Sequence, residues 1–232
     1  MGNIDGIIGI GFLAMVLIMI LAVILIGAVE HDRVIEERQN VYFQTIRALV
    51  VAIEEKDPYT KMHSHNVASF ASSIAKEMGL DSEKTQRIYI AGLLHDIGKI
   101  AVPELIINKP AKLTEAEYNL VKLHPGNGVR IVQNVAFSNN IIGAVCQHHE
   151  RWDGEGYQAG LAGEEIILFA RILAVADTID AMTSERSYRS ARHIHDVLDE
   201  LDRESGFQFD PEIVVVAKRL LVDGTLSKRS LA

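Results

Sequence analysis

The hydrophobic pattern of the chain begins with a long apolar run. Residues 6–29 contain no charged side chain, and a run of this length can cross the hydrocarbon core of a bilayer as a helix. No Lys or Arg precedes the run and no clear small-x-small cleavage site follows it, so a cleaved signal peptide is the weaker interpretation. We therefore predict that residues 1–30 form a transmembrane anchor.

The charges on either side of this run predict its orientation. Asp5 is the only charged side chain before it, whereas Arg33 and Arg38 follow it. Lys and Arg collect on the cytoplasmic side of membrane spans. We expect a single-pass protein of the inner (cytoplasmic) membrane, with the residues after the span in the cytoplasm.

A charged helical pattern follows the span. Ile35, Tyr42 and Leu49 are seven residues apart, and Ile46 and Ile53 fall on the same stripe. Such a stripe could join two protomers as a homodimer, or it could cover the chain's own domain. Both interpretations stay open, and we assign residues 31–47 to a helical linker.

Apolar positions at helical spacing recur through the rest of the chain. Gly79 is suited to end a helix, and Thr114 with Glu117 forms the pattern that begins another. The Gly-rich residues 150–165 are typical of a functional loop. Nothing in the pattern resembles a strand ladder. We predict an all-α domain over residues 48–222 and a tail over residues 223–232, with helices over residues 63–78, 82–100, 138–149, 168–183, 193–205 and 210–222.

The composition supports helices and argues against several other classes of protein. Five Pro and 6% aromatic residues in a chain of 232 suit long helices, and the length after the anchor suits one compact domain. Cys146 is the only cysteine, which excludes a disulfide framework and a Cys-rich zinc site. A formal net charge of -8 argues against a long nucleic acid as partner, because such proteins expose a basic face.

Two adjacent pairs of potential ligands stand out among the nine histidines, namely His95-Asp96 and His148-His149. Neighbours on a helix point about 100° apart, so each member of a pair can serve a different metal ion. The pairs therefore suit a two-metal centre. A single His is more often a core or capping residue than a ligand, but the whole set reverses that weighting. The set comprises His63, His95, Asp96, His124, His148, His149 and Asp177.

The charge balance of such a centre indicates a phosphate substrate. Asp96 and Asp177 are its only anions, so two divalent ions would keep a positive surplus that attracts a phosphodiester. His-rich ligation points to iron, manganese, zinc or a similar transition metal and away from calcium. Lys99, three residues after Asp96, could reach a phosphate oxygen or pair with the carboxylate; without a metal site it would be a solvated lysine.

These residues lie in motifs that resemble the HD-GYP family, a branch of the HD superfamily of metal-dependent phosphohydrolases. The resemblance covers residues 48–221 and rests on HDIGK at 95–99, HHERWDGEGY at 148–157 and ADTIDAMT at 176–183. It implies an HD-type helical bundle with two divalent transition metals, Fe or Mn first and Zn, Co or Ni as alternatives. It also implies that the seven residues above are the metal ligands, with Asp96 as the bridge.

The resemblance also implies a reaction and its substrate contacts. We expect a phosphodiesterase that opens cyclic di-GMP to linear pGpG and, as a further step, to GMP. Asp96 and Lys99 are then the catalytic residues. The substrate contacts that the family implies are Lys99, Tyr157, Asp180, Arg186 and Arg189.

Two positions depart from the family pattern. Gln158 stands where the family has proline, so the loop loses a rigid φ constraint and gains a backbone N–H donor. Tyr59 stands where members with a third metal carry an acidic residue. We therefore expect two metals and a bias toward stopping at the linear dinucleotide.

Two other functions stay open. The enzyme could act on another cyclic dinucleotide, a nucleotide or a phosphomonoester. Alternatively, the chain could be a weakly active signalling module that binds cyclic di-GMP and passes its state to partners through the helix next to the membrane. The complete ligand set argues against the signalling module, whereas Gln158 leaves it open.

Overall fold

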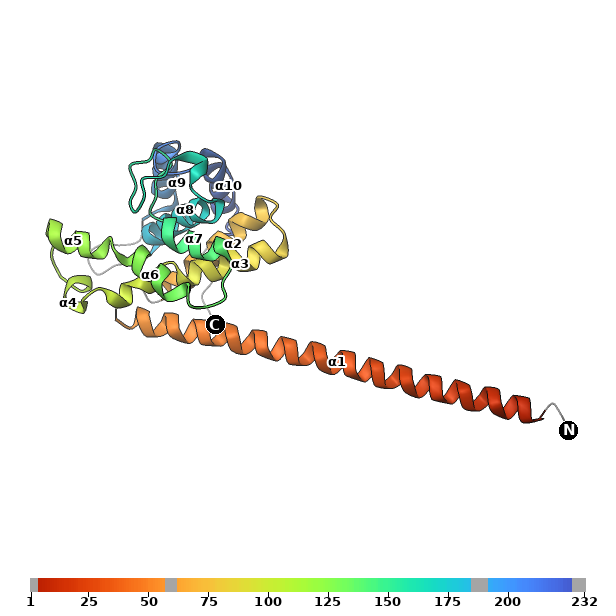
Figure 1. The fold of residues 1–232 in the computed structure, drawn as a ribbon. Coiled ribbons are helices and arrows are strands. Elements are labelled where there is room, and N and C mark those ends of the chain that lie inside the picture. The colour runs from red at the N-terminus through yellow and green to blue at the C-terminus, as the bar shows by residue number, and fades with distance from the viewer. Residues whose placement is uncertain (1–3, 57–61, 185–191, 227–232) are drawn as a thin grey trace. The chain divides into compact units, whose positions relative to one another are not determined.

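The regular elements of the chain are helices. The structure is a computed structural model that describes residues 4–56, 62–184 and 192–226 (Figure 1). Within these ranges the only β feature is one isolated bridge between Ser205 and Phe209. The prediction of an all-α protein is therefore confirmed.

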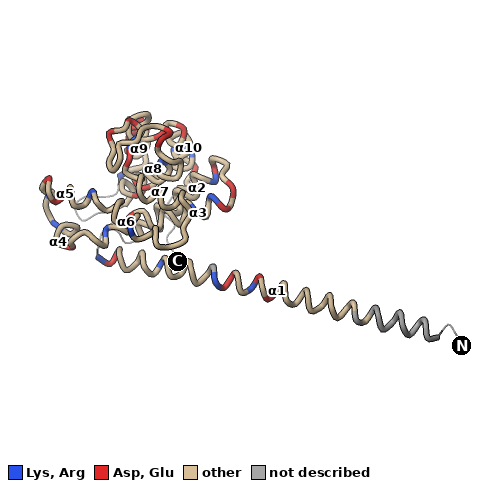
Figure 2. Tube along the Cα trace, in the orientation of Figure 1, with Lys and Arg blue, Asp and Glu red and all other residues tan. Residues whose placement is uncertain are grey.

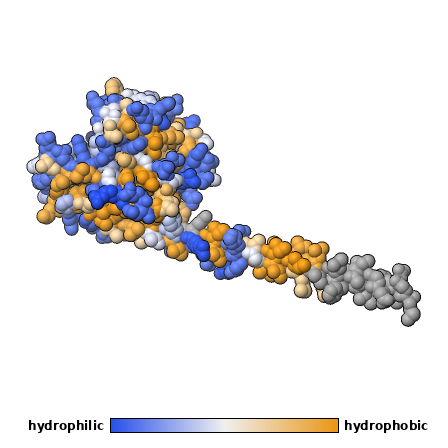
Figure 3. All heavy atoms as spheres, in the orientation of Figure 1, coloured by the Kyte–Doolittle hydropathy of each residue, from blue (hydrophilic) through white to orange (hydrophobic). Residues whose placement is uncertain are grey.

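The chain divides into two units, residues 1–46 and residues 47–232, which are described separately. Helix α1 (Ile4–Glu54) begins in the first unit and ends in the second. Acidic and basic residues are interspersed along α1 from Glu30 onward, and the ion pair Arg33–Glu37 spans 3.5 Å (Figure 2). The described large apolar side chains between Met15 and Val29 are exposed (Figure 3).

The structure does not support the transmembrane anchor predicted over residues 1–30. Among the described residues, no helix combines the length and the apolarity that crossing a membrane requires.

Helix α8 (Leu168–Thr183) is the central element of the second unit. It packs against α2 (His63–Glu77), α7 (Asn139–Gln147), α9 (Ile194–Glu204) and α10 (Pro211–Val222).

Buried side chains hold α8 in place. Ile172, Leu173 and Ile179 are completely buried, and each contributes about 1.5–3 kcal/mol relative to an exposed position. Asp177 and Asp180 lie on the same helix. The packing of α8 therefore fixes the position of both carboxylates.

Local signals in the sequence set several helix ends. The Thr114 side chain accepts from the N–H of Glu117, and the Glu117 carboxylate accepts from the N–H of Thr114, which begins α5 (Glu115–Val121). After α2, Gly79 has a φ of 83°, a conformation that glycine adopts without strain. Both ends agree with the sequence pattern.

The helix predicted over residues 82–100 is broken in the structure. Helix α3 (Ser82–Leu94) ends before His95, and a 3-10 helix, η1 (Ile97–Ala101), follows. Apolar residues continue at helical spacing across the break, so their pattern did not reveal it. The tighter turn allows η1 to pack against α6 (His124–Val132). Two further short elements are α4 (Glu104–Ile107) and η2 (Gly163–Glu165).

Met62 directly precedes α2 and carries backbone strain. Its φ of 67° and ψ of 0° are left-handed, and it is the only non-glycine with positive φ in the ranges that the structure describes. This conformation costs an ordinary residue about 1–2 kcal/mol, whereas the extra freedom of an unfolded glycine costs about 0.5–1 kcal/mol.

Met62→Gly should therefore stabilise the protein by about 0.5–1 kcal/mol and raise its Tm by roughly 1–4 °C in thermal unfolding. Gly79→Ala is the matched control, because no atom lies within 4 Å of the added Cβ and the substitution tests the backbone cost alone. It should lower the Tm. A lower Tm for Met62→Gly would show that the contacts of the methionine side chain stabilise the protein by more than the backbone strain destabilises it.

Candidate metal centre

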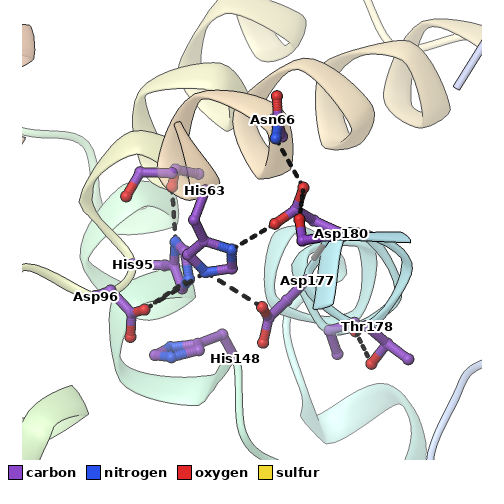
Figure 4. A network of polar contacts seen from close by, with 12 residues as sticks. His63, Asn66, His95, Asp96, His148, Asp177, Thr178 and Asp180 are labelled. Carbon is purple, nitrogen blue, oxygen red and sulfur yellow. Dashed lines mark hydrogen bonds and ion pairs between the residues drawn. The ribbon is translucent and has the colours of Figure 1, made fainter. Parts of the chain in front are cut away.

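Helix ends bring the predicted ligands together. His63 is the first residue of α2, and His124 is the first residue of α6. His95 and Asp96 lie at the break between α3 and η1, while His148 and His149 follow α7. Asp177 projects toward them from within α8 (Figure 4).

The ligands form two compact groups. In each group the potential ligand atoms of all three residues lie within 4.8 Å of one another. A divalent transition metal needs its ligands at about 2.0–2.2 Å, so each group could close around an ion with small side-chain movements. One group contains His124, His148 and His149, and the other contains His63, His95 and Asp177.

The Asp96 carboxylate lies between these two groups. Its Oδ1 is 3.2 Å from Nε2 of His124, in the first group. Its Oδ2 is 3.4 Å from Nε2 of His95 and 3.6 Å from Nε2 of His63, in the second group. Each carboxylate oxygen thus faces a different set of imidazoles, which is the arrangement that a ligand shared by two ions requires.

Lys99 and the surrounding rings keep Asp96 ionised. Burial raises the pKa of Asp96, but the Lys99 ammonium and the rings of His95, His124 and His63 together hold it well below its usual range. The Lys99 Nζ is 2.5 Å from Oδ2 of Asp96. Of the two roles considered for Lys99, pairing with the carboxylate is therefore the one present in the structure.

Backbone carbonyls fix the orientation of three imidazoles. Nδ1 of His95 lies 2.7 Å from the carbonyl oxygen of Gly92. Nδ1 of His124 and Nδ1 of His148 contact the carbonyls three residues before them, at 2.8 and 2.9 Å. A carbonyl oxygen only accepts, so each Nδ1 carries a proton, and Nε2 is the nitrogen that each ring directs into the cluster.

The positions of these nitrogens fit a metal. Nε2 of His124 and Nε2 of His148 are 3.1 Å apart, close enough for both to contact one ion. Nε2 of His95 is buried and has no hydrogen-bond partner within the part of the chain that the structure describes. One cation in each ligand group would use these nitrogens as donors, as expected for a transition-metal site.

Burial keeps two rings of the first group, His148 and His149, neutral. It lowers the pKa of His149 to about 4, against the opposing charge of Asp177, and it lowers the pKa of His148 well below 6.5 together with the neighbouring imidazoles. Neutral imidazoles have the lone pair that metal coordination needs.

His63 differs because carboxylates surround it. Its Nδ1 is 2.7 Å from Oδ2 of Asp180, and its Nε2 is 3.4 Å from Oδ1 of Asp177. Burial lowers the pKa of His63, but hydrogen bonds to Asp180 and Asp96 and the charge of Asp177 raise it to about 10 overall. A metal ion at Nε2 would take the place of a proton.

Asp180 lies behind His63 and is 1% exposed. Its other oxygen accepts from Nδ2 of Asn66 at 2.8 Å and from the Ser184 hydroxyl at 3.2 Å. The structure thus places Asp180 near the centre, where it orients a candidate ligand. The predicted substrate residues Arg186 and Arg189 lie outside the described residues, as does Tyr59.

A glycine allows η1 to reach α6. A Cβ on Gly98 would lie 1.9 Å from the carbonyl oxygen of His124 and 2.4 Å from the backbone nitrogen of Gly128. No side chain fits there. The lack of a side chain at Gly98 therefore lets Asp96 lie next to His124.

Glu150 organises the loop that follows the two adjacent histidines, a role that sequence reasoning did not identify. Its side chain is buried, and its Oε1 accepts the backbone N–H groups of Gln158 and Ala159 at 3.2 and 2.6 Å. Its Oε2 accepts those of Gly160 and Leu161 at 3.1 and 3.2 Å. Its position directly after the His pair was the available sequence signal.

The loop accommodates Gln158 in place of proline. Its backbone N–H is one of the four that Glu150 accepts, so the additional donor is satisfied. Its side-chain Nε2 also donates to the carbonyl oxygen of Lys122 at 2.7 Å. Gln158 therefore ties the loop to the residue that follows α5.

A cavity of about 320 Å³ opens beside His148, His149 and Asp177. The Tyr157 ring stacks on His149 with centroids 4.9 Å apart, and burial raises the pKa of its hydroxyl, which stays protonated. Lys122, which the sequence did not single out, also lines the cavity. Its Nζ is 4.8 Å from the ring centroid of Tyr118 and 5.3 Å from that of Tyr157.

Known proteins share these motifs and this fold. Residues 47–213 match the model of the family described as HD domain, and the chain belongs to this family. The chain is 41% identical, over 71% of its length, to a cyclic di-GMP phosphodiesterase of Pseudomonas aeruginosa and 38% identical, over 66%, to 3'3'-cGAMP-specific phosphodiesterase 1 of Vibrio cholerae. It spans only 40% and 35% of the lengths of these relatives. The HD-GYP resemblance is confirmed.

A solved structure shares the fold at lower sequence identity. It is a cyclic GMP-AMP-specific phosphodiesterase of Vibrio cholerae, which superimposes with a TM-score of 0.62 at 18% identity. The match covers 81% of this chain and 51% of the other. At this identity, the comparison establishes the HD-type helical fold.

Metal analysis should find about two ions per chain after anaerobic purification with Mn²⁺ or Fe²⁺. A metal concentration of 100 times Kd should stabilise the protein by about 2.7 kcal/mol, because only the folded state binds it, and a chelator should remove the gain. His148→Ala should lose at least one ion. His195→Ala is the control, since His195 is exposed and distant in sequence from the cluster; equal loss in both variants would contradict the site.

Proposed function

We propose that this chain is a metal-dependent phosphodiesterase that hydrolyses cyclic di-GMP to linear pGpG, with GMP as a further product. The observation that carries the proposal is the Asp96 carboxylate between two groups of ligands. Members of both groups line a cavity large enough for part of a dinucleotide. Residues 48–222 are proposed as the catalytic domain.

The chain contributes five imidazoles and two carboxylates to the proposed centre. This donor set favours two transition metals, Fe or Mn first, over Mg²⁺ or Ca²⁺. Bound metals would supply Lewis acidity and an activated water for attack on phosphorus. The residues direct the Nε2 atoms into the centre, bury most of the ligands, and place Lys99 beside the Asp96 carboxylate.

The cavity offers groups suited to a nucleotide. Tyr157 presents an aromatic ring on which a base can stack, an interaction worth about 1–3 kcal/mol. The Lys122 ammonium lies over the Tyr118 and Tyr157 rings, where it can pair with a phosphate. Arg186 and Arg189 are proposed to add positive charge from the segment beyond the described residues.

The names of the relatives favour a cyclic dinucleotide as substrate. The relative from P. aeruginosa is named for cyclic di-GMP at 41% identity, and the one from V. cholerae for 3'3'-cGAMP at 38%. We therefore take 3'3'-cGAMP as the alternative substrate. Two further expectations stay predictions from the sequence. One is that two protomers associate through residues 31–47, and the other is that the chain lies at the cytoplasmic face of a membrane.

His95→Ala should reduce hydrolysis of cyclic di-GMP to background, because it removes a donor from one ion and leaves Asp96 without that neighbour. The assay uses the full chain loaded with Mn²⁺ or Fe²⁺ without oxygen, with products separated by anion exchange. His195→Ala should retain wild-type turnover.

The wild-type results separate the alternatives. Hydrolysis of cyclic di-GMP to pGpG, with or without further conversion to GMP, supports the proposal. Faster hydrolysis of 3'3'-cGAMP would make that dinucleotide the substrate. Bound metal without hydrolysis of either nucleotide would favour the signalling module. Full activity of His95→Ala would exclude the proposed centre.

Lys122→Met should raise KM for cyclic di-GMP about tenfold while kcat changes little. The substitution removes a charge that contributes equally to binding substrate and transition state, at about 1–2 kcal/mol, and keeps an aliphatic chain over the tyrosine rings. Lys112→Met is the control, because Lys112 is exposed and outside the cavity. An unchanged KM in Lys122→Met would remove Lys122 from the binding site.

A further inference from the structure

The first turn of α2 needs a capping group from elsewhere in the chain. Met62 occupies the N-cap position, and its side chain forms no capping hydrogen bond. The first four residues of the helix include no acidic side chain. The exposed N–H groups of a helix start need acceptors, and a negative charge there is favourable.

Glu54, the last residue of α1, supplies that group. Its Oε1 accepts the backbone N–H of Ser64 at 2.9 Å, and its Oε2 accepts the backbone N–H of Met62 at 3.2 Å. Both oxygens of one carboxylate are thus used on one helix start. The second of these bonds also holds Met62 in its strained left-handed conformation.

The two bonded residues flank His63. Its ring enters the candidate centre, with Nε2 3.6 Å from Oδ2 of Asp96 and 3.4 Å from Oδ1 of Asp177. Because Glu54 fixes the backbone immediately before and after His63, it determines where the ring's Cα–Cβ bond points.

We propose that Glu54 is a positioning residue for His63 and thereby for the affinity of the metal centre. The inference rests on the proposed function only in taking His63 as a metal ligand. Glu54 acts through the backbone of Met62 and Ser64, not by touching metal or substrate.

Lys56, two residues after Glu54, contacts the other side of the centre. Lys56 Nζ donates to the carbonyl oxygen of Ile100 in η1 at 3.0 Å, and the Lys56 carbonyl accepts from Nδ2 of Asn108 at 2.9 Å. Glu54, Lys56, His63 and Asp96 line one small cavity. Residues 54–56 therefore support both the α2 and the η1 sides of the centre.

Glu54→Gln tests the proposal in the full chain. The amide nitrogen cannot accept, so one backbone N–H loses its partner while size is preserved. Affinity for Mn²⁺, measured by titration with detection of the free ion, should fall roughly 10- to 100-fold, the range found when groups that orient ligands are changed. Glu55→Gln, at the exposed neighbouring position, should bind Mn²⁺ as the wild type does.

A double variant tests the route through the backbone. Glycine adopts the Met62 conformation without strain, so Met62→Gly combined with Glu54→Gln should recover most of the lost Mn²⁺ affinity. A purely structural role would move the Tm without this rescue. If Glu54→Gln alone unfolds at the assay temperature, the Mn²⁺ affinity of the double variant is compared with that of the wild type instead.

Three results would overturn the proposal: wild-type Mn²⁺ affinity in Glu54→Gln, equal losses in Glu54→Gln and Glu55→Gln, or no recovery in the double variant. Its failure is distinguishable from that of the proposed function. Wild-type protein that binds Mn²⁺ but leaves cyclic di-GMP intact would change the substrate assignment and leave this test valid.

Discussion

Imidazole nitrogens crowded into one buried space are the constraint on which this domain depends. The Nε2 atoms of His124 and His148 face each other at 3.1 Å, and the Asp96 carboxylate contacts both groups of ligands. Hydrophobic packing brings these groups together. Ile172, Leu173 and Ile179, fully buried on α8, provide part of that packing. The fold thus holds in place a site in which Nε2 of His95 has no hydrogen-bond partner among the described residues, and a bound ion would supply one.

Helix ends are suited to building such a site. The last carbonyl groups of a helix lack partners within the helix, and a histidine just beyond them can donate its Nδ1 proton to one. His95, His124 and His148 all do so, each to the carbonyl three residues earlier, which aims Nε2 away from the helix. The same bond therefore satisfies the backbone and selects the tautomer that can bind a metal.

Three carboxylates outside the ligand set hold the parts of the site in position. Asp180 orients the His63 ring, Glu150 gathers four backbone N–H groups of the Gly-rich loop, and Glu54 caps α2. Each joins segments that are well separated along the chain or folds a loop back on itself. Glu150 holds the loop through these hydrogen bonds, so the loop does not depend on a rigid proline. Gln158 can therefore replace proline, and its backbone N–H is one of the four that Glu150 accepts.

The sequence by itself determined the helical class, the capping box at Thr114 and the seven residues that meet at the centre, because helical periodicity, capping and motif spacing are local patterns. Only the tertiary structure decided that α3 ends at Leu94, that Lys122 lines the cavity, and that Glu54 caps α2. Apolar spacing continues through the break, where close packing of Gly98 against α6 selects the tighter turn. A backbone N–H satisfied by a distant carboxylate leaves no local trace, since its partner is chosen by the way the helices pack.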